Sequence, residues 1–128
     1  MWFVSEHKKP CARSLFVHDA FPNGRIWFVS RHEGAIEWAK HFDLPVDVWA
    51  KHLSVADISA GDVVLGTLPV DLIAQLSAQS TRVYFLVMPL RLNQRGHELS
   101  LEEMLQMQCY LQEYVVSLGE KIILGVWI

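Results

Sequence analysis

The fold is decided by one stretch, Ile26-Trp27-Phe28-Val29-Ser30-Arg31-His32-Glu33-Gly34-Ala35-Ile36-Glu37-Trp38, whose character changes in the middle. Its first four residues are apolar, aromatic or β-branched, which is typical of a buried strand. From Ser30 onward the side chains are polar, and apolar residues then return at a helical spacing. The stretch therefore predicts a strand, a polar turn and a helix.

The polar turn is a candidate binding site. In open α/β sheets, ligands bind beyond the carboxyl ends of the strands, where helix N-termini offer free N–H groups and partial positive charge. Arg31 can bind a phosphate through two hydrogen bonds, His32 can transfer a proton near neutral pH, and Ser30 can orient either of them. The alternative is a polar turn that binds no ligand.

The rest of the chain alternates strands and helices. The predicted elements are a helix from Glu33 to about His41, strands at Val46–Leu53 and Val63–Gly66, a helix from Val70 to about Ala78, and a strand at Arg82–Met88. Such alternation predicts an α/β fold, a three-layer sandwich on a mostly parallel central sheet.

A second strand-to-helix turn follows at Gly66-Thr67-Leu68-Pro69, where the proline suits the first residue of a helix. If both turns lie at the same sheet edge, Gly66, Thr67 and Leu68 can offer backbone N–H groups and a hydroxyl to the phosphate that Arg31 binds. The alternative is a tight turn with no ligand.

The C-terminal third begins with a polar loop, Leu90 to Glu98, in which Arg95 is a candidate second cation. A capping box, Ser100 to Glu103, then predicts the start of a long helix that ends at Gly119. The apolar run Ile122–Ile128 predicts a final strand that is paired or buried at an interface.

Length and composition limit the alternatives. The 128 residues suffice for one domain, which we place at residues 25–128, preceded by an N-terminal extension at residues 1–24 with an extra strand or hairpin. Trp2–His7 nearly repeats Trp27–His32, either by shared strand composition or because the extension adds an edge strand.

Charge and cysteine content exclude several classes. A formal charge of −3 argues against a protein that binds long nucleic acid, but leaves a small anionic ligand open. The two cysteines, Cys11 and Cys109, form no metal-binding or disulfide pattern, so we expect no metal site and a reducing cytoplasmic location. No apolar run is long enough for a membrane span.

Several motifs in order carry a resemblance. They are Phe28–His32 with Gly34–Trp38, Gly61-Asp62, Gly66–Val70, Arg95-Gly96 and Glu98–Ser100. Over roughly Arg25 to Ser117 the chain resembles a small family of Csx-type (Csx16-like) accessory proteins of type III CRISPR systems. Residues 1–24 and the tail from Ile122 fall outside the resemblance.

The resemblance implies a Rossmann-like domain related to CARF sensor domains. It further implies a ring nuclease that cleaves cyclic oligoadenylate, with cyclic tetra-adenylate the favoured ring, and so switches off type III antiviral signalling. A ring of linked adenylates carries its own nucleophile, the 2′-OH, so neither a metal nor another cofactor is required. A two-fold homodimer would present this symmetric polyanion with two copies of each turn.

Site roles follow from that chemistry. Arg31 would neutralise the charge that develops on phosphorus, and His32 would act as general acid or base. Ser30 and the Thr67 turn would position a phosphate, with Arg95 as a second cation.

Three alternatives remain open at this point. One is a sensor or sponge that binds cyclic oligoadenylate without cleaving it. Another is a histidine phosphatase, since Arg31-His32 is similar to the Arg-His-Gly signature of that family, although Glu33 stands where the signature has glycine. The third is an adaptor that uses the aromatic N-terminal segment and the tail from Ile122.

Overall fold

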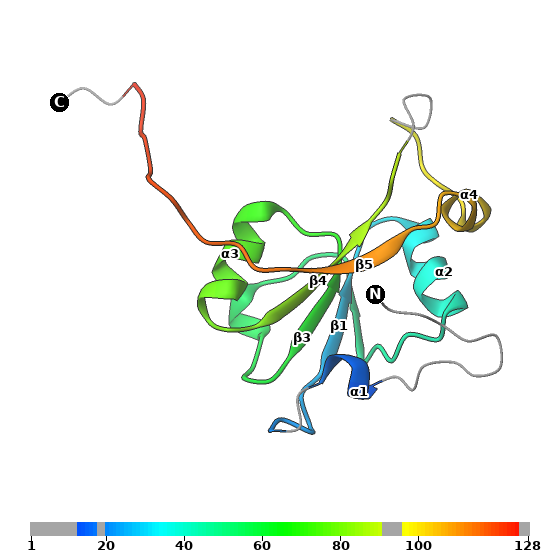
Figure 1. Cartoon of the computed structure of the whole chain (residues 1–128), viewed down its shortest axis with the longest axis horizontal. Coiled ribbons are helices and arrows are strands. Elements are labelled where there is room, and N and C mark those ends of the chain that lie inside the picture. Colours follow the sequence, from blue (N-terminus) through cyan, green and yellow to red (C-terminus); the bar gives the residue numbers. More distant parts are fainter. Residues whose placement is uncertain (1–12, 18–19, 91–95, 126–128) are drawn as a thin grey trace.

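A computed structural model describes residues 13–17, 20–90 and 96–125 of the chain (Figure 1). Its sheet contains β1 (Ile26–Val29), β2 (Val48–Ala50), β3 (Val63–Gly66), β4 (Arg82–Val87) and β5 (Tyr110–Tyr114). The strand order is β2-β1-β3-β4-β5. The first four strands pair in parallel and β5 pairs antiparallel to β4. The predicted α/β class and mostly parallel sheet are confirmed.

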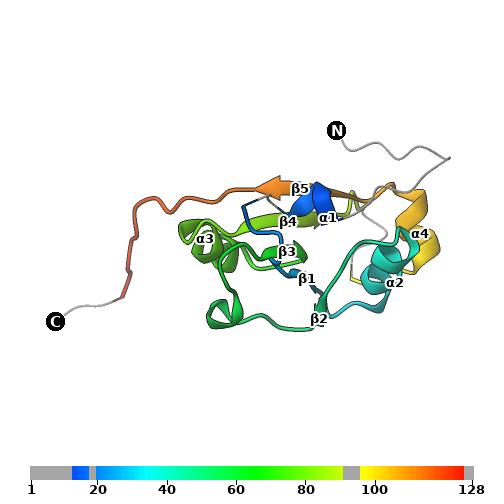
Figure 2. The same ribbon diagram turned by 90° about the horizontal axis from the view of Figure 1, so that it is seen from below.

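The helices connect these strands. They are α1 (Arg13–Phe16), α2 (Glu33–His41), the 3-10 turn η1 (Val55–Asp57), α3 (Val70–Ala78) and α4 (Leu101–Gln106). Figure 2 shows the strands between α3 on one side and α2 with α4 on the other. The predicted bounds of α2 and α3 agree with the structure, and Pro69 lies at the N-cap of α3.

The central strands are buried on both faces, because alternate side chains enter two different cores. In β1, Ile26 and Phe28 pack with Trp38 of α2 and Met104 of α4. Trp27 and Val29, the residues between them, pack with α3 in the second core. This explains why β1 and β3 are continuous apolar runs rather than alternating ones.

The long helix predicted from the capping box to Gly119 is wrong. The box itself is present, since the Ser100 side chain accepts from Glu103 and the Glu103 side chain accepts from Ser100. However, α4 ends at Gln106. The φ of Gln108 is 58°, in the left-handed region, so a right-handed helix cannot continue through this residue. The following residues form β5 instead.

The error has a physical cause. Leu111, Val115 and Leu118 are spaced like one face of a helix, but burial alternates along β5 with a period of two. The edge of β4 was available for pairing, and β5 satisfies its backbone groups there. The predicted final strand is also wrong for residues 122–125, which form no strand. Residues 126–128 lie outside the described residues.

The N-terminal extension is described only in part. Arg13–Phe16 forms a single helical turn, and Phe16 packs into the core against Tyr84 with 5.1 Å between ring centroids. The extra strand or hairpin stays a prediction for the stretch that precedes this turn, which lies outside the described residues.

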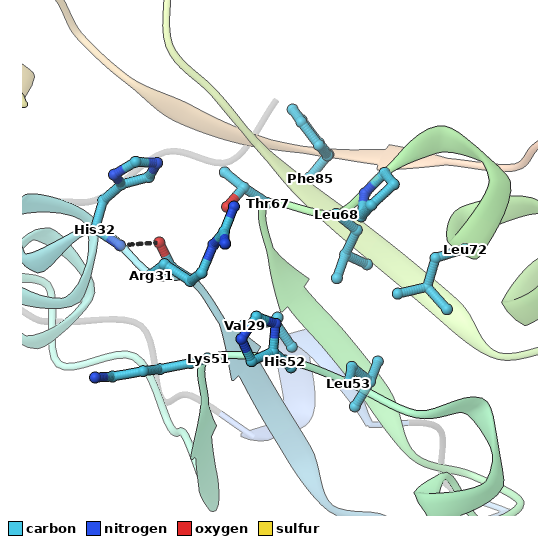
Figure 3. A pocket seen from close by; sticks show the side chains of 12 residues that line it. Val29, Arg31, His32, Lys51, His52, Leu53, Thr67, Leu68, Leu72 and Phe85 are labelled. Carbon is cyan, nitrogen blue, oxygen red and sulfur yellow. Dashed lines mark hydrogen bonds between the residues drawn. The ribbon is translucent and has the colours of Figure 1, made fainter. Parts of the chain in front are cut away.

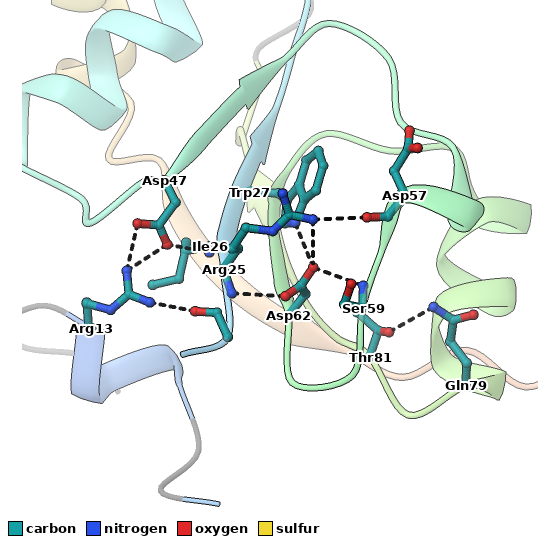
Figure 4. A network of polar contacts seen from close by, with 11 residues as sticks. Arg13, Arg25, Ile26, Trp27, Asp47, Asp57, Ser59, Asp62, Gln79 and Thr81 are labelled. Carbon is teal, nitrogen blue, oxygen red and sulfur yellow. Dashed lines mark hydrogen bonds and ion pairs between the residues drawn. The ribbon is translucent and has the colours of Figure 1, made fainter. Parts of the chain in front are cut away.

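The Gly61-Asp62 motif directly precedes β3, so it lies at the amino ends of the parallel strands, at the edge of the sheet opposite the predicted site. Figure 4 shows the contacts of Asp62 there. The Asp62 carboxylate is buried and accepts hydrogen bonds from the N–H groups of Arg25 at 2.9 Å and Ser59 at 3.0 Å. It also accepts one from the indole N–H of Trp27 at 3.1 Å. A buried carboxylate with three donors holds the loop against β1, so this motif is structural.

Candidate functional site

A pocket of about 400 Å³ opens at the carboxyl ends of β1, β2 and β3 (Figure 3). The chain runs from β1 outward to β2 and then crosses back to β3 on the other side of β1. Such a reversal of strand order leaves a crevice where ligands bind in open α/β sheets. The pocket therefore lies where the sequence predicted a site.

The first turn forms one wall of the pocket. Ser30 is 3% exposed, and its Oγ accepts a hydrogen bond from the His32 N–H at 3.1 Å. Its own N–H donates to Ala50 O at 3.0 Å, which ties the turn to β2. Ser30 thus shapes the turn through one lone pair of its hydroxyl oxygen, and the O–H can still donate a hydrogen bond.

Arg31 lines the pocket with an exposed side chain, and Figure 3 shows its guanidinium reaching across toward Thr67. Within the described parts of the chain, no hydrogen bond or ion pair engages this guanidinium. Arg25 and Arg82, by contrast, are paired with carboxylates. Arg31 is therefore a cation available to an anionic ligand.

His32 is the N-cap of α2, and 57% of its side chain is exposed. Its Nδ1 lies 3.2 Å from Oε1 of Glu98, the last residue of the stretch Leu90 to Glu98. A carboxylate at Nδ1 favours the tautomer with a proton on that nitrogen and leaves Nε2 available as a base. His32 and Glu98 both belong to the motifs that carry the family resemblance, but the sequence did not predict that the two side chains are in contact.

Lys51 and His52 also line the pocket, and sequence analysis missed both as site residues. They follow β2 directly and are exposed. Because β2 pairs with β1, they lie beside Arg31 and His32 at the same sheet edge (Figure 3). A polar pair directly after a strand was the available signal, but the strand order that brings the two turns together was not in the sequence.

The second turn contributes differently from the prediction. Gly66 does not line the pocket; its Cα is packed against β1, and a Cβ there would lie 2.1 Å from Val29 O. The Thr67 N–H donates to Val29 O at 2.9 Å and is not free for a phosphate. What Thr67 presents to the pocket is its side chain.

The opposite wall is apolar. Leu68 is buried in the core beneath the pocket, and Leu53, Leu72 and Phe85 complete the wall. The pocket thus has cationic and titratable groups on one side and an apolar surface on the other (Figure 3). Such a surface can pack against a flat heterocycle.

Two further points concern candidate residues. Arg95, the predicted second cation, lies outside the described residues. Across residues 13–17, 20–90 and 96–125, no group of three or more His, Cys, Asp or Glu side chains is placed to hold a metal ion. Over the same residues, no helix combines the length and apolar character that a membrane span requires.

Comparison with known proteins identifies the family. The family model described as "Putative CRISPR-associated protein (Cas_VVA1548)" matches residues 27–117, from the second residue of β1 to beyond β5. No curated protein and no solved structure matches the chain. The match includes every residue of the sheet except Ile26 and every residue that lines the pocket, and the chain belongs to the Cas_VVA1548 family of CRISPR-associated proteins.

Proposed function

We propose that this protein is a ring nuclease that binds cyclic oligoadenylate, with cyclic tetra-adenylate the favoured ring, and cleaves it by attack of a ribose 2′-OH. The observation that carries the proposal is the pocket at the carboxyl ends of β1 to β3, in which Arg31, His32, Lys51 and His52 face an apolar wall. Membership of a CRISPR-associated family also supports the proposal, because the proposed messenger belongs to CRISPR signalling.

The two sides of the pocket suit the two parts of a nucleotide. Arg31 and Lys51 can neutralise a phosphate, and the guanidinium can contact two of its oxygens at once. Leu53, Leu72 and Phe85 can contact the face of an adenine. Neither side alone would favour a nucleotide over an inorganic anion or an apolar compound.

The reaction needs two proton transfers and charge neutralisation. The 2′-oxygen forms a bond to the neighbouring phosphorus while the bond from phosphorus to the 5′-oxygen breaks. One base accepts the 2′-hydroxyl proton and one acid protonates the leaving 5′-oxygen. His32 and His52 are the two histidines in the pocket, and Arg31 would stabilise the charge on the phosphoryl oxygens.

Because the nucleophile belongs to the ligand, the main task of the protein is orientation. Holding the 2′-oxygen in line with the bond that breaks supplies a large share of the rate. The hydrogen bonds that fix Ser30, and the contact of His32 with Glu98, support such fixed geometry. We therefore expect a metal ion to be unnecessary.

Pocket size favours two copies around one ring. A volume of about 400 Å³ lies near the lower end of the range of about 300–1,000 Å³ for small-molecule sites. One chain would enclose only part of a ring of four nucleotides, so the proposal includes a homodimer. It also includes a Rossmann-like, CARF-related fold, which is supported by the strand order and the core on both faces.

The test is incubation of the protein with cyclic tri-, tetra- and hexa-adenylate in the presence of EDTA, followed by chromatography with mass detection. Linear products that end in a 2′,3′-cyclic phosphate and a 5′-hydroxyl are expected. Rings that stay intact but elute with the protein would show a binding protein instead, and rings that neither bind nor change would exclude both functions.

A further inference from the structure

The C-terminal arm, which we define as residues 115–125, is the most exposed apolar segment that the structure describes. Its large apolar side chains are 67–85% exposed at Val115, Leu118, Ile122, Ile123 and Leu124. A soluble chain seldom leaves so many large apolar groups in sequence without a partner. The arm therefore needs a surface to cover it.

The base of the arm is fixed to its own domain. The Val116 N–H donates to Ser77 Oγ of α3 at 3.1 Å, and Val116 packs against the core on that face. Beyond this contact the arm leaves the sheet and runs past α3, away from the rest of the chain (Figure 1). Ile122 to Leu124 line none of the cavities described along the chain.

A groove of matching chemistry lies at the other end of β5. This groove is a cavity of about 650 Å³, larger than the proposed active-site pocket, and we define it by its lining residues Leu15, Phe16, Tyr84, Gln108, Tyr110, Leu111 and Gln112. Its floor is apolar, and the side chains of Gln108 and Gln112 can bond the N–H and C=O groups of an extended chain. The groove thus suits an apolar peptide.

The arm cannot fill the groove of its own chain along the path it takes. The groove flanks Tyr110 at the start of β5, whereas the arm begins after Tyr114 at the end of β5 and continues in the same direction (Figure 1). We propose that the arm of one chain docks through Ile122 to Leu124 in the groove of a second copy, and that the exchange is reciprocal. A reciprocal contact of this kind closes into a dimer with two-fold symmetry.

The inference explains two features together. Among the described residues, one chain supplies both an apolar arm and an apolar groove that nothing covers, so a second copy suffices as the partner. It concerns assembly only and does not depend on the chemistry of the pocket. A failure of the cleavage assay would leave it standing. Its own failure would exclude only this mode of dimer formation, and the cleavage assay would still test the proposed function by itself.

The test measures oligomeric state by sedimentation velocity with the full chain. The unchanged protein is expected to be a dimer, and the double variant Ile122→Asp with Leu124→Asp to be a monomer. Charges on two side chains that are buried in the dimer should raise the dissociation constant at least about 100-fold. Val70→Asp is the matched control, because Val70 is equally apolar and 67% exposed but lies outside the arm.

Leu15→Asp tests the groove from the other side and should also give a monomer. Circular dichroism checks that each variant is folded. Mixing the arm variant with the Leu15→Asp variant should restore dimers, because one intact arm then meets one intact groove. A monomeric unchanged protein, a dimer that persists in the arm variant, or a mixture that stays monomeric would each overturn the proposal.

Discussion

The Thr67 backbone N–H donates a hydrogen bond to the carbonyl oxygen of Val29, with 2.9 Å between nitrogen and oxygen. This bond joins the ends of β1 and β3 at the point where both turns leave the sheet. The two walls of the pocket are therefore held to one another through the backbone. Substitution of a residue that permits this close approach should therefore lower the stability of the fold, whether or not a ligand is bound.

Gly66→Ala tests that conclusion. Gly66 has a φ of 120°, and a Cβ would lie 2.1 Å from Val29 O. Backbone strain and the clash together should lower the free energy of unfolding by at least about 2 kcal/mol. Urea denaturation measures this change.

Gly119→Ala is the matched control for that experiment. A Cβ at Gly119 meets nothing within 4 Å, so the change should stay within about 0.5 kcal/mol. A Gly66→Ala variant as stable as the control would mean that β1 and β3 can separate at this edge without cost.

The parts of the fold that could be predicted are those that local pattern determines. β1 and β3 are short apolar runs, and α2 and α3 carry helical spacing with clear ends. β5 could not be predicted in this way, because Leu111 and Val115 fit a helix as well as a strand. The deciding factor was the free edge of β4, which is distant in sequence.

Only one part of the candidate site could be predicted from the sequence. Arg31 and His32 lie in the turn that follows β1, so the rule that ligands bind beyond the carboxyl ends of strands finds them. Lys51 and His52 join them only because β2 pairs with β1, and pairing order follows from tertiary packing rather than from local sequence. Thr67 was placed correctly at the edge, but its N–H is bonded to Val29.

Asp47 should make stability depend on pH. Burial acts to raise the pKa of Asp47, but hydrogen bonds from Arg13 and from the Ile26 N–H, with the charges of Arg13 and Arg25, lower it below 3.8 overall (Figure 4). A carboxyl whose pKa is lower in the folded state stabilises the fold above its unfolded pKa. That contribution is lost as the pH falls through the folded pKa.

We therefore expect Asp47→Asn to lower the free energy of unfolding by about 0.5–1 kcal/mol at pH 7, since the pair is partly exposed. The difference from the unchanged protein should shrink as the pH falls below the unfolded pKa of Asp47, about 4, and on through its lower folded pKa. Urea denaturation at several pH values measures it. A difference that stays constant down to pH 2.5 would assign the effect to packing rather than to charge.

Cys109 should resist alkylation in the folded protein. Burial raises the pKa of the Cys109 thiol to about 11, and only the thiolate reacts. At pH 8 iodoacetamide should modify Cys109 more than about 100-fold more slowly in the native protein than in urea. Peptide mass mapping assigns the modified residue, and equal rates in both states would mean that the turn between α4 and β5 opens readily.

Arg31→Ala should separate function from stability most clearly. The Arg31 guanidinium is exposed and pairs with no other residue in the described parts of the chain, so its loss should change the free energy of unfolding by less than about 0.5 kcal/mol. Removing one group that stabilises charge in the transition state should cut ring cleavage about 100- to 1,000-fold. Product formation from cyclic tetra-adenylate measures the rate. Lys40→Ala is the control, because Lys40 is exposed in the last turn of α2 and its ammonium lies over the Trp49 ring, outside the residues that line the pocket. Cleavage at the native rate by Arg31→Ala would remove the reaction from this pocket, and an equal loss in Lys40→Ala would mean that net charge, not position, sets the rate.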